Sequence, residues 1–480
     1  MLARRISPAV LLGVWVLPFI SSQTGRRRYP DATHECFGER DTERVCKFHE
    51  LILYNTKFYY VTRDPDAVFL PRVEMTWKSD VENINRWDLQ VHLVTPDQLP
   101  FDPQMTSTDS VVNAILWVRA DHVSNMYHMM AEHSPSMHGV MCRYLGFCRY
   151  AEHSPDDDIQ IVFLDDNVQA NGDDHVHNLN HIWDCLSSRP FLEINDANTR
   201  AKAIVMKTVV AGIGRECRAF QWCSGPTASR APLATPLIAS WRTRMSQCVG
   251  VQPAAVAKHD EYRVTIVQRS RKHKRSLLNI LDVVRHFRKN QGVIMKVYYM
   301  DDLTVSQQAH IFARSDVVIA VHGACTGHLV FLPINAVFIE VMPYNWPTRH
   351  EFESAYVDDL SPVSNIALLG CGVLSLDHAH LRIEYMLDDP IYQSLSLKQR
   401  VELFEKGTCP GHVGGYDDRV DHCQNTWWLH TSDVALEIEK LEHVLPQAFN
   451  HIRNASFKRQ NELGTLVNPA SGMQRLFVEY

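Results

Sequence analysis

The sequence predicts an α/β fold in two domains. Runs rich in β-branched residues alternate with helical segments through the second half of the chain, a pattern typical of βαβ units and a parallel sheet. Further apolar, strand-like runs occur in the first half. At 480 residues the chain is longer than a single hydrophobic core supports. Pro, Gly, Ser and Ala cluster over residues 225–236, where we expect the linker between the domains.

Residues 1–28 have the composition of a secretory leader. MLARR supplies positive charge, residues 6–21 are mainly apolar, and three arginines follow. The apolar stretch is shorter than the roughly 20 residues of a full membrane span, and Ile20 and Ser22 make a poor cleavage site. Two interpretations stay open, a cleaved signal peptide and a single type II membrane anchor. Both place the remaining chain in the lumen of the secretory pathway, in the Golgi or the endoplasmic reticulum.

Twelve cysteines agree with an oxidising compartment, where disulfides persist. Three pairs are close enough in sequence to close short loops: Cys36 with Cys46, Cys142 with Cys148, and Cys217 with Cys223. None of these spacings is the C-x-x-C of a structural zinc site, so we expect no metal there. Cys325 and Cys371 lie in apolar stretches and are expected to be buried free thiols.

Periodic segments are few before residue 110, and we expect residues 29–110 to form an irregular N-terminal extension. Residues 111–235 are expected to form the first α/β domain. Its strands are predicted at residues 114–120, 159–164 and 203–212, and residues 125–146 are predicted to be partly helical.

Residues 236–450 are expected to form the second α/β domain, followed by a C-terminal tail over residues 451–480. Its strands are predicted at residues 263–267, 293–299, 316–321 and 336–341, and its helices at residues 276–292 and 304–315. Ser276 is the expected N-cap of the first of these helices, and Gly292 its end.

The charge distribution argues against nucleic acid as a partner. The chain carries 48 basic and 55 acidic residues, and its formal net charge is −7. Because the two signs are mixed along the sequence, no large basic surface is expected to bind a polyanion by counterion release.

Two groups suited to phosphate follow neighbouring strands of the second domain. His322, Gly323 and Ala324 follow one strand, and a run of five cations that includes Arg269 and Arg271 follows another. The carboxyl ends of parallel strands meet at one sheet edge, where ligands collect, and guanidinium groups match diphosphate oxygens. The pattern indicates a nucleotide diphosphate site. A tight turn with a hydrogen-bonded histidine and a solvated run of charge are the structural alternatives.

The stretch from VTIVQRSRKHKRSLLN to VFIEVMPYNW resembles glycosyltransferase family 61, which includes plant β-1,2-xylosyltransferases and animal protein O-linked N-acetylglucosaminyltransferases. Family members carry an arginine pair before an Asn, a Gln in the next helix, a His-Gly-Ala-Gly turn and a Leu-Phe-Leu-Pro stretch. The matching residues here are Arg269, Arg275, Asn279, Gln307 or Gln308, His322, Gly323, Ala324 and the LVFLP of residues 329–333. One departure is Cys325-Thr326, where the family usually has Gly-Leu.

A second motif in the first half is similar to the family's N-x-x-H-x-x-x-E. It consists of Asn125, His128 and Glu132. An inverting transfer needs a base that takes the proton of the acceptor. His128 and Glu132, four residues apart, share a face if this segment is helical. Either is a candidate base, and the alternative is a core histidine with a surface partner.

The resemblance implies a GT-B-like architecture, in which two Rossmann-like domains face each other across a cleft. It implies an inverting glycosyltransferase that moves xylose, arabinose or N-acetylglucosamine from a UDP-sugar to a glycan or glycoprotein. The first domain holds the acceptor and the second holds the donor. No metal or other cofactor is required, because cationic side chains can stabilise the leaving group.

The resemblance also implies roles for single residues of the second domain. Arg269 and Arg275 hold the diphosphate, and His322 with the amides of Gly323 and Ala324 stabilises the charge on the departing UDP. Asn279 belongs to the same donor-binding set. Tyr344, which follows the last predicted strand, is a candidate for stacking on the base or the sugar.

A catalytically degenerate module that binds glycans or nucleotide sugars is the alternative function. Cys325-Thr326 in place of Gly-Leu supports this alternative. Retention of Arg269, Arg275 and the His-Gly-Ala turn argues for catalysis, because a protein that only binds glycans needs no group for a diphosphate. The sequence identifies neither the donor sugar nor the acceptor.

Overall fold

A computed structural model places most of the two predicted domains. The residues that it describes are 32–39, 44–73, 75, 89–101, 108–119, 125–146, 159–165, 175–213, 235–252, 261–270, 275–290, 292–343, 360, 363–372, 379–380, 393, 396–398 and 433–462. The expected leader over residues 1–28, most of the expected linker and Tyr344 lie outside this set. Within it, no helix combines the length and the apolar character that crossing a membrane requires.

The second domain contains a parallel sheet, as predicted. Its order is β10 (Val293–Tyr299), β9 (Tyr262–Gln268), β11 (Val317–Val321), β12 (Val337–Met342) and β13 (Ala367–Gly372), and every neighbouring pair is parallel. The chain adds β10 on one side of β9 and then β11 on the other side. This reversal between β9 and β11 is the topological switch point, outside which ligands bind in such sheets.

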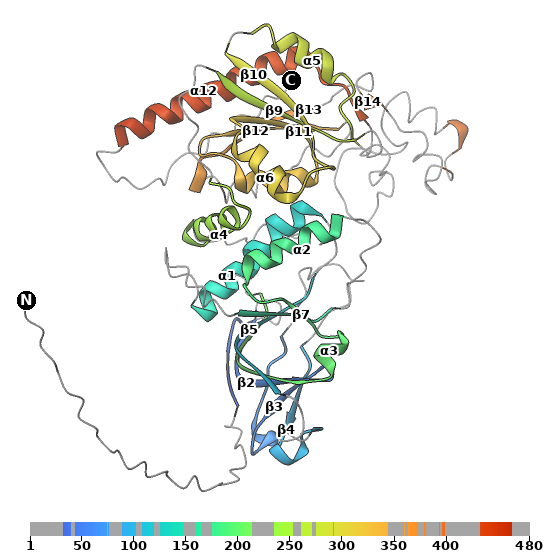
Figure 1. The fold of residues 1–480 in the computed structure, drawn as a ribbon, viewed down its shortest axis with the longest axis vertical. Coiled ribbons are helices and arrows are strands. Elements are labelled where there is room, and N and C mark those ends of the chain that lie inside the picture. The colour runs from blue at the N-terminus through green and yellow to red at the C-terminus, as the bar shows by residue number, and fades with distance from the viewer. Residues whose placement is uncertain are drawn as a thin grey trace, which may run out of the picture.

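Helices cover both faces of this sheet (Figure 1). Helices α5 (Ile280–Phe287) and α12 (Ile438–Glu462) lie on one face, and α6 (Val305–Ala313) lies on the face toward the first domain. β11 connects to β12 through a short 3-10 helix, η6 (Ala324–Phe331). Because both faces are covered, the strands are mainly apolar runs, and this explains why the boundaries of β9 to β12 were predicted to within one or two residues.

Three boundaries of the second domain differ from the prediction. Helix α5 begins at Ile280 with Asn279 as its N-cap residue, not at Ser276, and it ends at Phe287, before Gly292. Ser276 is held instead by a strand-like pairing with residues 433–434, a long-range contact that local periodicity cannot reveal. Helix α12 continues to Glu462, so the expected tail over residues 451–480 begins with helix.

The first domain is built on an eight-stranded mixed sheet. The predicted strands appear as β5 (Thr108–Trp117), β6 (Ile159–Phe163) and β8 (Ala203–Ala211), which are parallel to one another. The other members are β1 (Thr33–Phe37), β2 (Val45–Tyr54), β3 (Lys57–Val61), β4 (Val91–Val94) and β7 (Leu192–Glu193), with the short helices η2 (Pro65–Ala67), η3 (Pro96–Gln98) and α3 (Ala197–Arg200).

The expectation that residues 29–110 are irregular was wrong, because β1 to β4 belong to this sheet. β2 pairs with β8 along most of its length and with β3 through a hairpin. The two turn residues, Asn55 and Thr56, both have positive φ, of 44° and 66°. Such a turn favours Asn-Gly or Asp-Gly, and a β-branched residue at the second position hid the hairpin from sequence analysis.

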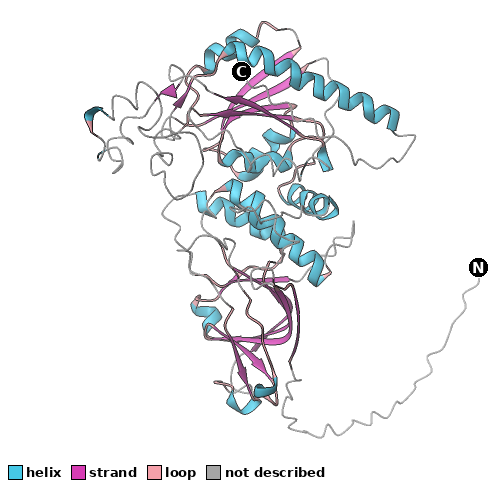
Figure 2. Ribbon diagram, turned by 180° about the vertical axis from the view of Figure 1, so that it is seen from behind, coloured by secondary structure: helices cyan, strands magenta, loops and turns pink. Residues whose placement is uncertain are grey.

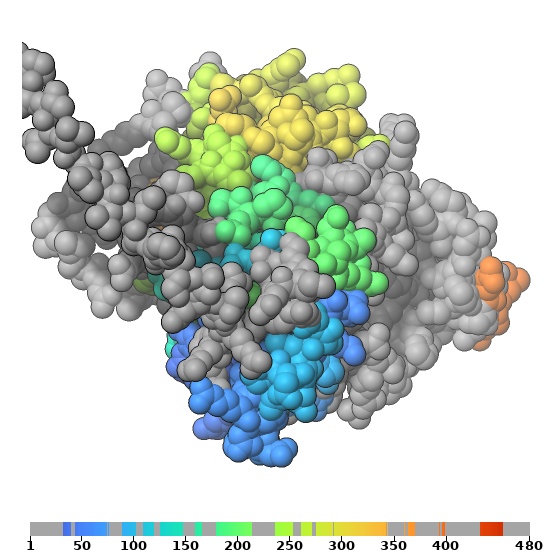
Figure 3. Space-filling model, turned by 60° about the horizontal axis from the view of Figure 1, so that its bottom comes forward, coloured from blue at the N-terminus to red at the C-terminus, as the bar shows by residue number. Residues whose placement is uncertain are grey.

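A layer of helices lies between the two sheets (Figure 2). It includes α1 (Ser134–Leu145) and α2 (His175–Leu186) of the first half and α4 (Thr235–Cys248) of the second. In the space-filling view, green residues of the first half lie between the blue residues of β1 to β4 and the yellow residues of the second domain (Figure 3). One buried apolar cluster runs through this layer into both sheets.

Polar contacts also connect the halves. Trp241 Nε1 on α4 donates to Ser134 Oγ on α1 at 3.1 Å. Within the second half, Arg242 Nε on α4 donates to the carbonyl of Val330 at 2.9 Å, and its Nη2 donates to the carbonyl of Leu332, which fixes α4 to η6. Because these groups are buried, breaking one of the bonds leaves an unsatisfied polar atom in the core. The two sheets are therefore held together by packing and by buried hydrogen bonds.

The disulfides agree in part with the prediction. Cys36 pairs with Cys46 across β1 and β2, as expected. Cys142 is disulfide-bonded, while Cys148, Cys217 and Cys223 lie outside the described residues. Cys185 on α2 pairs with Cys248 on α4 across 63 positions of sequence, a separation that gave no local signal.

Candidate active site

The strand ends at the switch point of the second sheet bring the predicted donor-binding residues together. Arg269 follows β9 directly, and His322 and Gly323 follow β11. Gly323 has a φ of +150°. A Cβ at this position would lie 2.0 Å from Arg269 Nη2 and 3.3 Å from Arg275 Nη1. Both guanidinium groups therefore lie against the Cα of Gly323, where a Cβ would displace them and the positive φ favours glycine.

His322 is held at both its backbone and its ring. Arg275 Nη1 donates to the His322 carbonyl at 2.8 Å. The His322 Nδ1 lies 2.7 Å from Oε1 of Glu340, a buried carboxylate on β12. With Glu340 ionised, Nδ1 carries the proton and donates, so the ring orientation is fixed by the carboxylate. Two guanidinium groups and one oriented imidazole thus converge on a single turn.

Glu340 was missed by the sequence analysis, although a signal existed. It stands in the apolar strand run AVFIEV, and its side chain is only 3% exposed. Carboxylates are almost never fully buried unless they are paired. An acidic residue in the centre of a parallel strand therefore indicates a buried partner at the neighbouring strand end.

The departure from the family pattern, Cys325-Thr326, is accommodated within the turn. The backbone N–H and the hydroxyl of Thr326 both donate to the Gly323 carbonyl, at 3.0 and 2.8 Å. Cys325 is a free thiol, as predicted, but its residue is half-buried and not fully buried. Burial raises the pKa of Cys325 to about 11, with Arg269 acting in the opposite direction. The thiol is therefore neutral at physiological pH and adds no negative charge beside the two guanidinium groups.

Asn279, the N-cap residue of α5, is bonded to the segment before α12. Its Nδ2 donates to the carbonyl of Leu436 at 2.8 Å, and its Oδ1 accepts from the backbone N–H of Leu436 at 2.8 Å. Both polar ends of the amide are thus engaged with the segment before α12. Asn279 therefore holds the chain that packs beside the arginine loop, and its place in the donor-binding set stays a prediction.

The second predicted motif lies on a π-helical turn, η4 (His128–His133), at the start of α1. His128 Nδ1 lies 2.9 Å from Glu132 Oε2, so the two side chains lie on the same face of this turn. Their side chains are 19% and 15% exposed, which fits neither a core histidine nor a surface carboxylate. Among the described residues, Glu132 Oε1 is buried without a hydrogen-bond partner. π-Helical turns within α-helices are frequent at functional sites.

The two motifs meet where η4 packs against η6. Gly327, three residues after Ala324, lies so close to Met126 that a Cβ at residue 327 would be 2.5 Å from the Met126 carbonyl oxygen. The helical turn that carries His128 and Glu132 is therefore adjacent to the helix that begins in the His-Gly-Ala turn. Residues almost 200 positions apart form one candidate site between the sheets.

Gly327→Ala is expected to destabilise the protein by about 1–3 kcal/mol, because the new methyl group meets backbone that cannot move aside. Denaturant unfolding of the wild-type and variant proteins measures this difference. The matched control is Gly146→Ala, where a Cβ meets no atom within 4 Å and only the positive φ opposes substitution. An equal or smaller loss for Gly327→Ala than for the control would contradict the close approach of the two motifs.

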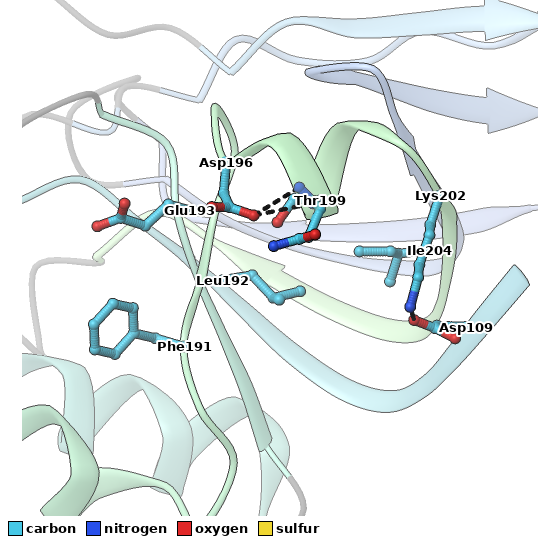
Figure 4. A pocket seen from close by; sticks show the side chains of 9 residues that line it. Asp109, Phe191, Leu192, Glu193, Asp196, Thr199, Lys202 and Ile204 are labelled. Atoms are coloured by element: carbon cyan, nitrogen blue, oxygen red, sulfur yellow. Dashed lines mark hydrogen bonds and ion pairs between the residues drawn. The ribbon is translucent and has the colours of Figure 1, made fainter. Parts of the chain in front are cut away.

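A hollow of about 350 Å³ lies elsewhere, beside β7 and α3 (Figure 4). Its charged groups already have partners within the protein. Asp109 pairs with Lys202 at 3.2 Å, and Asp196 accepts from the backbone of α3. Glu193 pairs with Arg119 at 2.9 Å. Each charged group of this lining is therefore bound within the protein. The hollow is separate from the switch point of the second sheet.

One cluster of metal-ligating atom types is present in the described part of the chain. His181, Cys185 and Cys248 bring one ligand atom each within 4.8 Å of one another. Because Cys185 and Cys248 form a disulfide, their thiolates are not available as ligands. Asp165, part of a sequence pair of acidic residues, is bound to the guanidinium of Arg119.

Comparison with known protein families gives the same family as the sequence motifs. The sequence model of the family described as Glycosyltransferase 61 matches residues 69–339, more than half of the chain. The chain belongs to glycosyltransferase family 61. The matched region contains both motifs of the candidate site and ends immediately before Glu340. Among curated proteins, none matches the chain.

Membership in glycosyltransferase family 61 makes this protein a glycosyltransferase, which uses a sugar donor and a glycan acceptor. The α/β architecture with two sheets is consistent with such an enzyme. The family and the disulfides are also compatible with the lumen of the secretory pathway.

Proposed function

We propose that this glycosyltransferase is an inverting enzyme that uses a UDP-sugar, with xylose, arabinose or N-acetylglucosamine as the transferred group. In this proposal the acceptor is a glycan or glycoprotein in the secretory pathway, and the two halves work as a GT-B-like pair. The single observation that carries it is the convergence of Arg269 and Arg275 on Gly323, at the switch point of a parallel sheet. A diphosphate is a ligand that two neighbouring guanidinium groups match.

The donor-binding residues would act by stabilising negative charge on the leaving group. As the bond between the sugar and the diphosphate breaks, negative charge grows on the β-phosphate of UDP. Arg269 and Arg275 would bind this charge, and His322 would contribute its ring, oriented by Glu340. Donors that are fixed before the reaction stabilise such charge without reorganising. The proposal needs no metal ion, since the cationic side chains take that role, and none of its steps uses one.

The acceptor side would act through the pair of His128 and Glu132. The acceptor hydroxyl attacks the anomeric carbon opposite the departing UDP, and its proton must be removed. His128 with Glu132 resembles a base with its orienting carboxylate, and the buried Oε1 of Glu132 offers a second acceptor. We treat the pair as one unit. Its position beside η6 supports a role near the donor's reacting carbon.

A degenerate binding module remains the second candidate, and Cys325-Thr326 is the feature that favours it. Two observations weaken this candidate. Thr326 closes the turn with its own hydroxyl, and the Cys325 thiol stays neutral, so neither residue opposes a diphosphate.

A single N-terminal anchor is part of the proposal for localisation only and rests on the composition of residues 1–28.

Equilibrium binding of UDP, UMP and uridine to the purified protein tests the donor proposal. We expect UDP to raise the melting temperature and to bind at least tenfold more tightly than uridine, because the second phosphate engages both guanidinium groups. The three compounds share one base and one sugar, so the differences isolate the phosphates. Equal affinity for UDP and uridine, or no binding of either by folded protein, would overturn the proposed donor site.

A further inference from the structure

In the loop that carries Arg269 and Arg275, Ser276 Oγ donates to the Ser270 carbonyl at 3.2 Å, and the base of the loop is closed by Gln268. This residue is the last of β9 and is only 5% exposed. Its Oε1 accepts from the backbone N–H of Arg269 at 3.0 Å and of Leu277 at 2.9 Å. Its Nε2 donates to the carbonyl of Leu277 at 2.6 Å. One amide therefore bonds the two ends of the loop to each other.

A second element holds the same loop from outside. The segment Asp433–Leu436 pairs with residues 276–279 as a short added strand. The Ser276 N–H donates to Asp433 Oδ1 at 2.8 Å, and the Val434 N–H donates to the Ser276 carbonyl at 2.9 Å. Asn279 completes the pairing through its two bonds with Leu436. This segment fixes the loop immediately after Arg275.

The need for such fixation is visible in the backbone of Arg275. Its φ is +66°, a left-handed conformation that costs a residue other than glycine about 1 kcal/mol or more. Strained conformations persist where the surroundings hold them. Here the conformation directs the guanidinium toward the His322 carbonyl and Gly323. The bonds of Gln268 and of the 433–436 segment therefore hold Arg275 in a conformation that its own backbone preference disfavours.

We propose that Gln268 is a positioning residue of the donor site, which places both arginines for the diphosphate by closing their loop. This inference rests on the proposed function, because it assumes that Arg269 and Arg275 bind a diphosphate. Gln268 itself touches no donor atom in this account. It acts through Arg269 and Arg275.

An amide suits this task better than a carboxylate. The position requires an acceptor for two N–H groups and a donor for one carbonyl, and a neutral amide supplies both. An ionised Glu could not donate to the Leu277 carbonyl and would add negative charge beside a diphosphate. The reverse assignment of the amide would set its NH₂ against two backbone N–H donors, so the network fixes its orientation.

Gln268→Leu tests the inference, with Gln160→Leu as the matched control. Gln160 is also 5% exposed, lies on a strand, and donates from its amide to two backbone carbonyls, at 3.1 and 2.7 Å. It belongs to the first sheet, away from the arginine loop. Both substitutions remove a buried amide of the same size, so a general loss of stability appears in both variants.

Two measurements distinguish whether Gln268 closes the loop from whether this closure positions the arginines for UDP. Hydrogen exchange of the Arg269 and Leu277 amides in the unliganded protein needs no donor, and we expect it to accelerate at least tenfold in Gln268→Leu only. We expect UDP affinity to fall 10- to 100-fold in Gln268→Leu, with uridine affinity unchanged, while Gln160→Leu stays within twofold of wild type.

Unchanged exchange at both amides in Gln268→Leu would overturn the closure itself. Faster exchange with unchanged UDP affinity would overturn the positioning role. A wild-type protein that binds no UDP would instead refute the proposed donor, and the exchange result would still decide whether Gln268 closes the loop.

Discussion

Arg269→Ala and Arg275→Ala are each expected to weaken UDP binding by 10- to 100-fold. A hydrogen bond to a charged group contributes about 1.5–3 kcal/mol, and each 1.4 kcal/mol corresponds to about tenfold in affinity. Both guanidinium groups lie against Gly323, so each is expected to engage the diphosphate directly. Calorimetric titration with UDP and with uridine measures the change, and uridine affinity should not move.

Arg263→Ala is the matched control for the two arginines. Arg263 lies on the same strand, β9, but at its opposite end, where its guanidinium binds Asp316 at 2.7 Å. Its removal is expected to lower stability and to leave UDP affinity within about twofold. Wild-type UDP affinity in both Arg269→Ala and Arg275→Ala would end the assignment of the diphosphate site, whatever the control shows.

Substitution of the His128–Glu132 pair is expected to have the larger effect on turnover. A positioned general base contributes typically 10²- to 10⁴-fold to the rate. His128→Ala and Glu132→Gln should therefore lower kcat by about 10²- to 10⁴-fold while leaving the affinity for UDP unchanged. Steady-state rates at saturating donor, with UDP affinity measured separately, distinguish the two parameters.

The control for this pair is His138→Ala, on the following helix. His138 is also largely buried, but its Nε2 lies 3.1 Å from Ser240 Oγ on α4, a contact between helices. We expect its loss to affect stability more than kcat. A wild-type kcat in both His128→Ala and Glu132→Gln would remove the pair as the base. Loss of UDP binding in Glu132→Gln would instead indicate that Glu132 takes part in donor binding.

The second domain could be predicted in detail because its signals are local. Parallel strands covered on both faces are continuous apolar runs, and β9 to β12 matched such runs within two residues. The positions of Arg269 and His322 at one sheet edge followed from that topology alone. The first domain was harder to predict. The turn of the β2–β3 hairpin is formed by Asn55-Thr56, which is not a typical hairpin sequence, and polar residues interrupt the apolar pattern of β2.

The supporting residues of the site could not be predicted, because they depend on contacts between distant segments. Gln268 and Asn279 have roles only once residues 277 and 436 are placed beside them. Glu340 gains its role from a neighbouring strand, although its burial in an apolar run was a usable signal. The family motif identified Asn279, but only the structure indicates that its amide holds a backbone segment.

The most direct test of the central claim is the release of UDP from UDP-xylose, UDP-arabinose and UDP-N-acetylglucosamine by wild-type and Arg269→Ala protein, with a chelator present. We expect the wild-type protein to release UDP from one of these donors and the variant to do so at least tenfold more slowly. No release from any of them by folded wild-type protein, or equal rates for both proteins, would contradict a UDP-sugar site at the ends of β9 and β11.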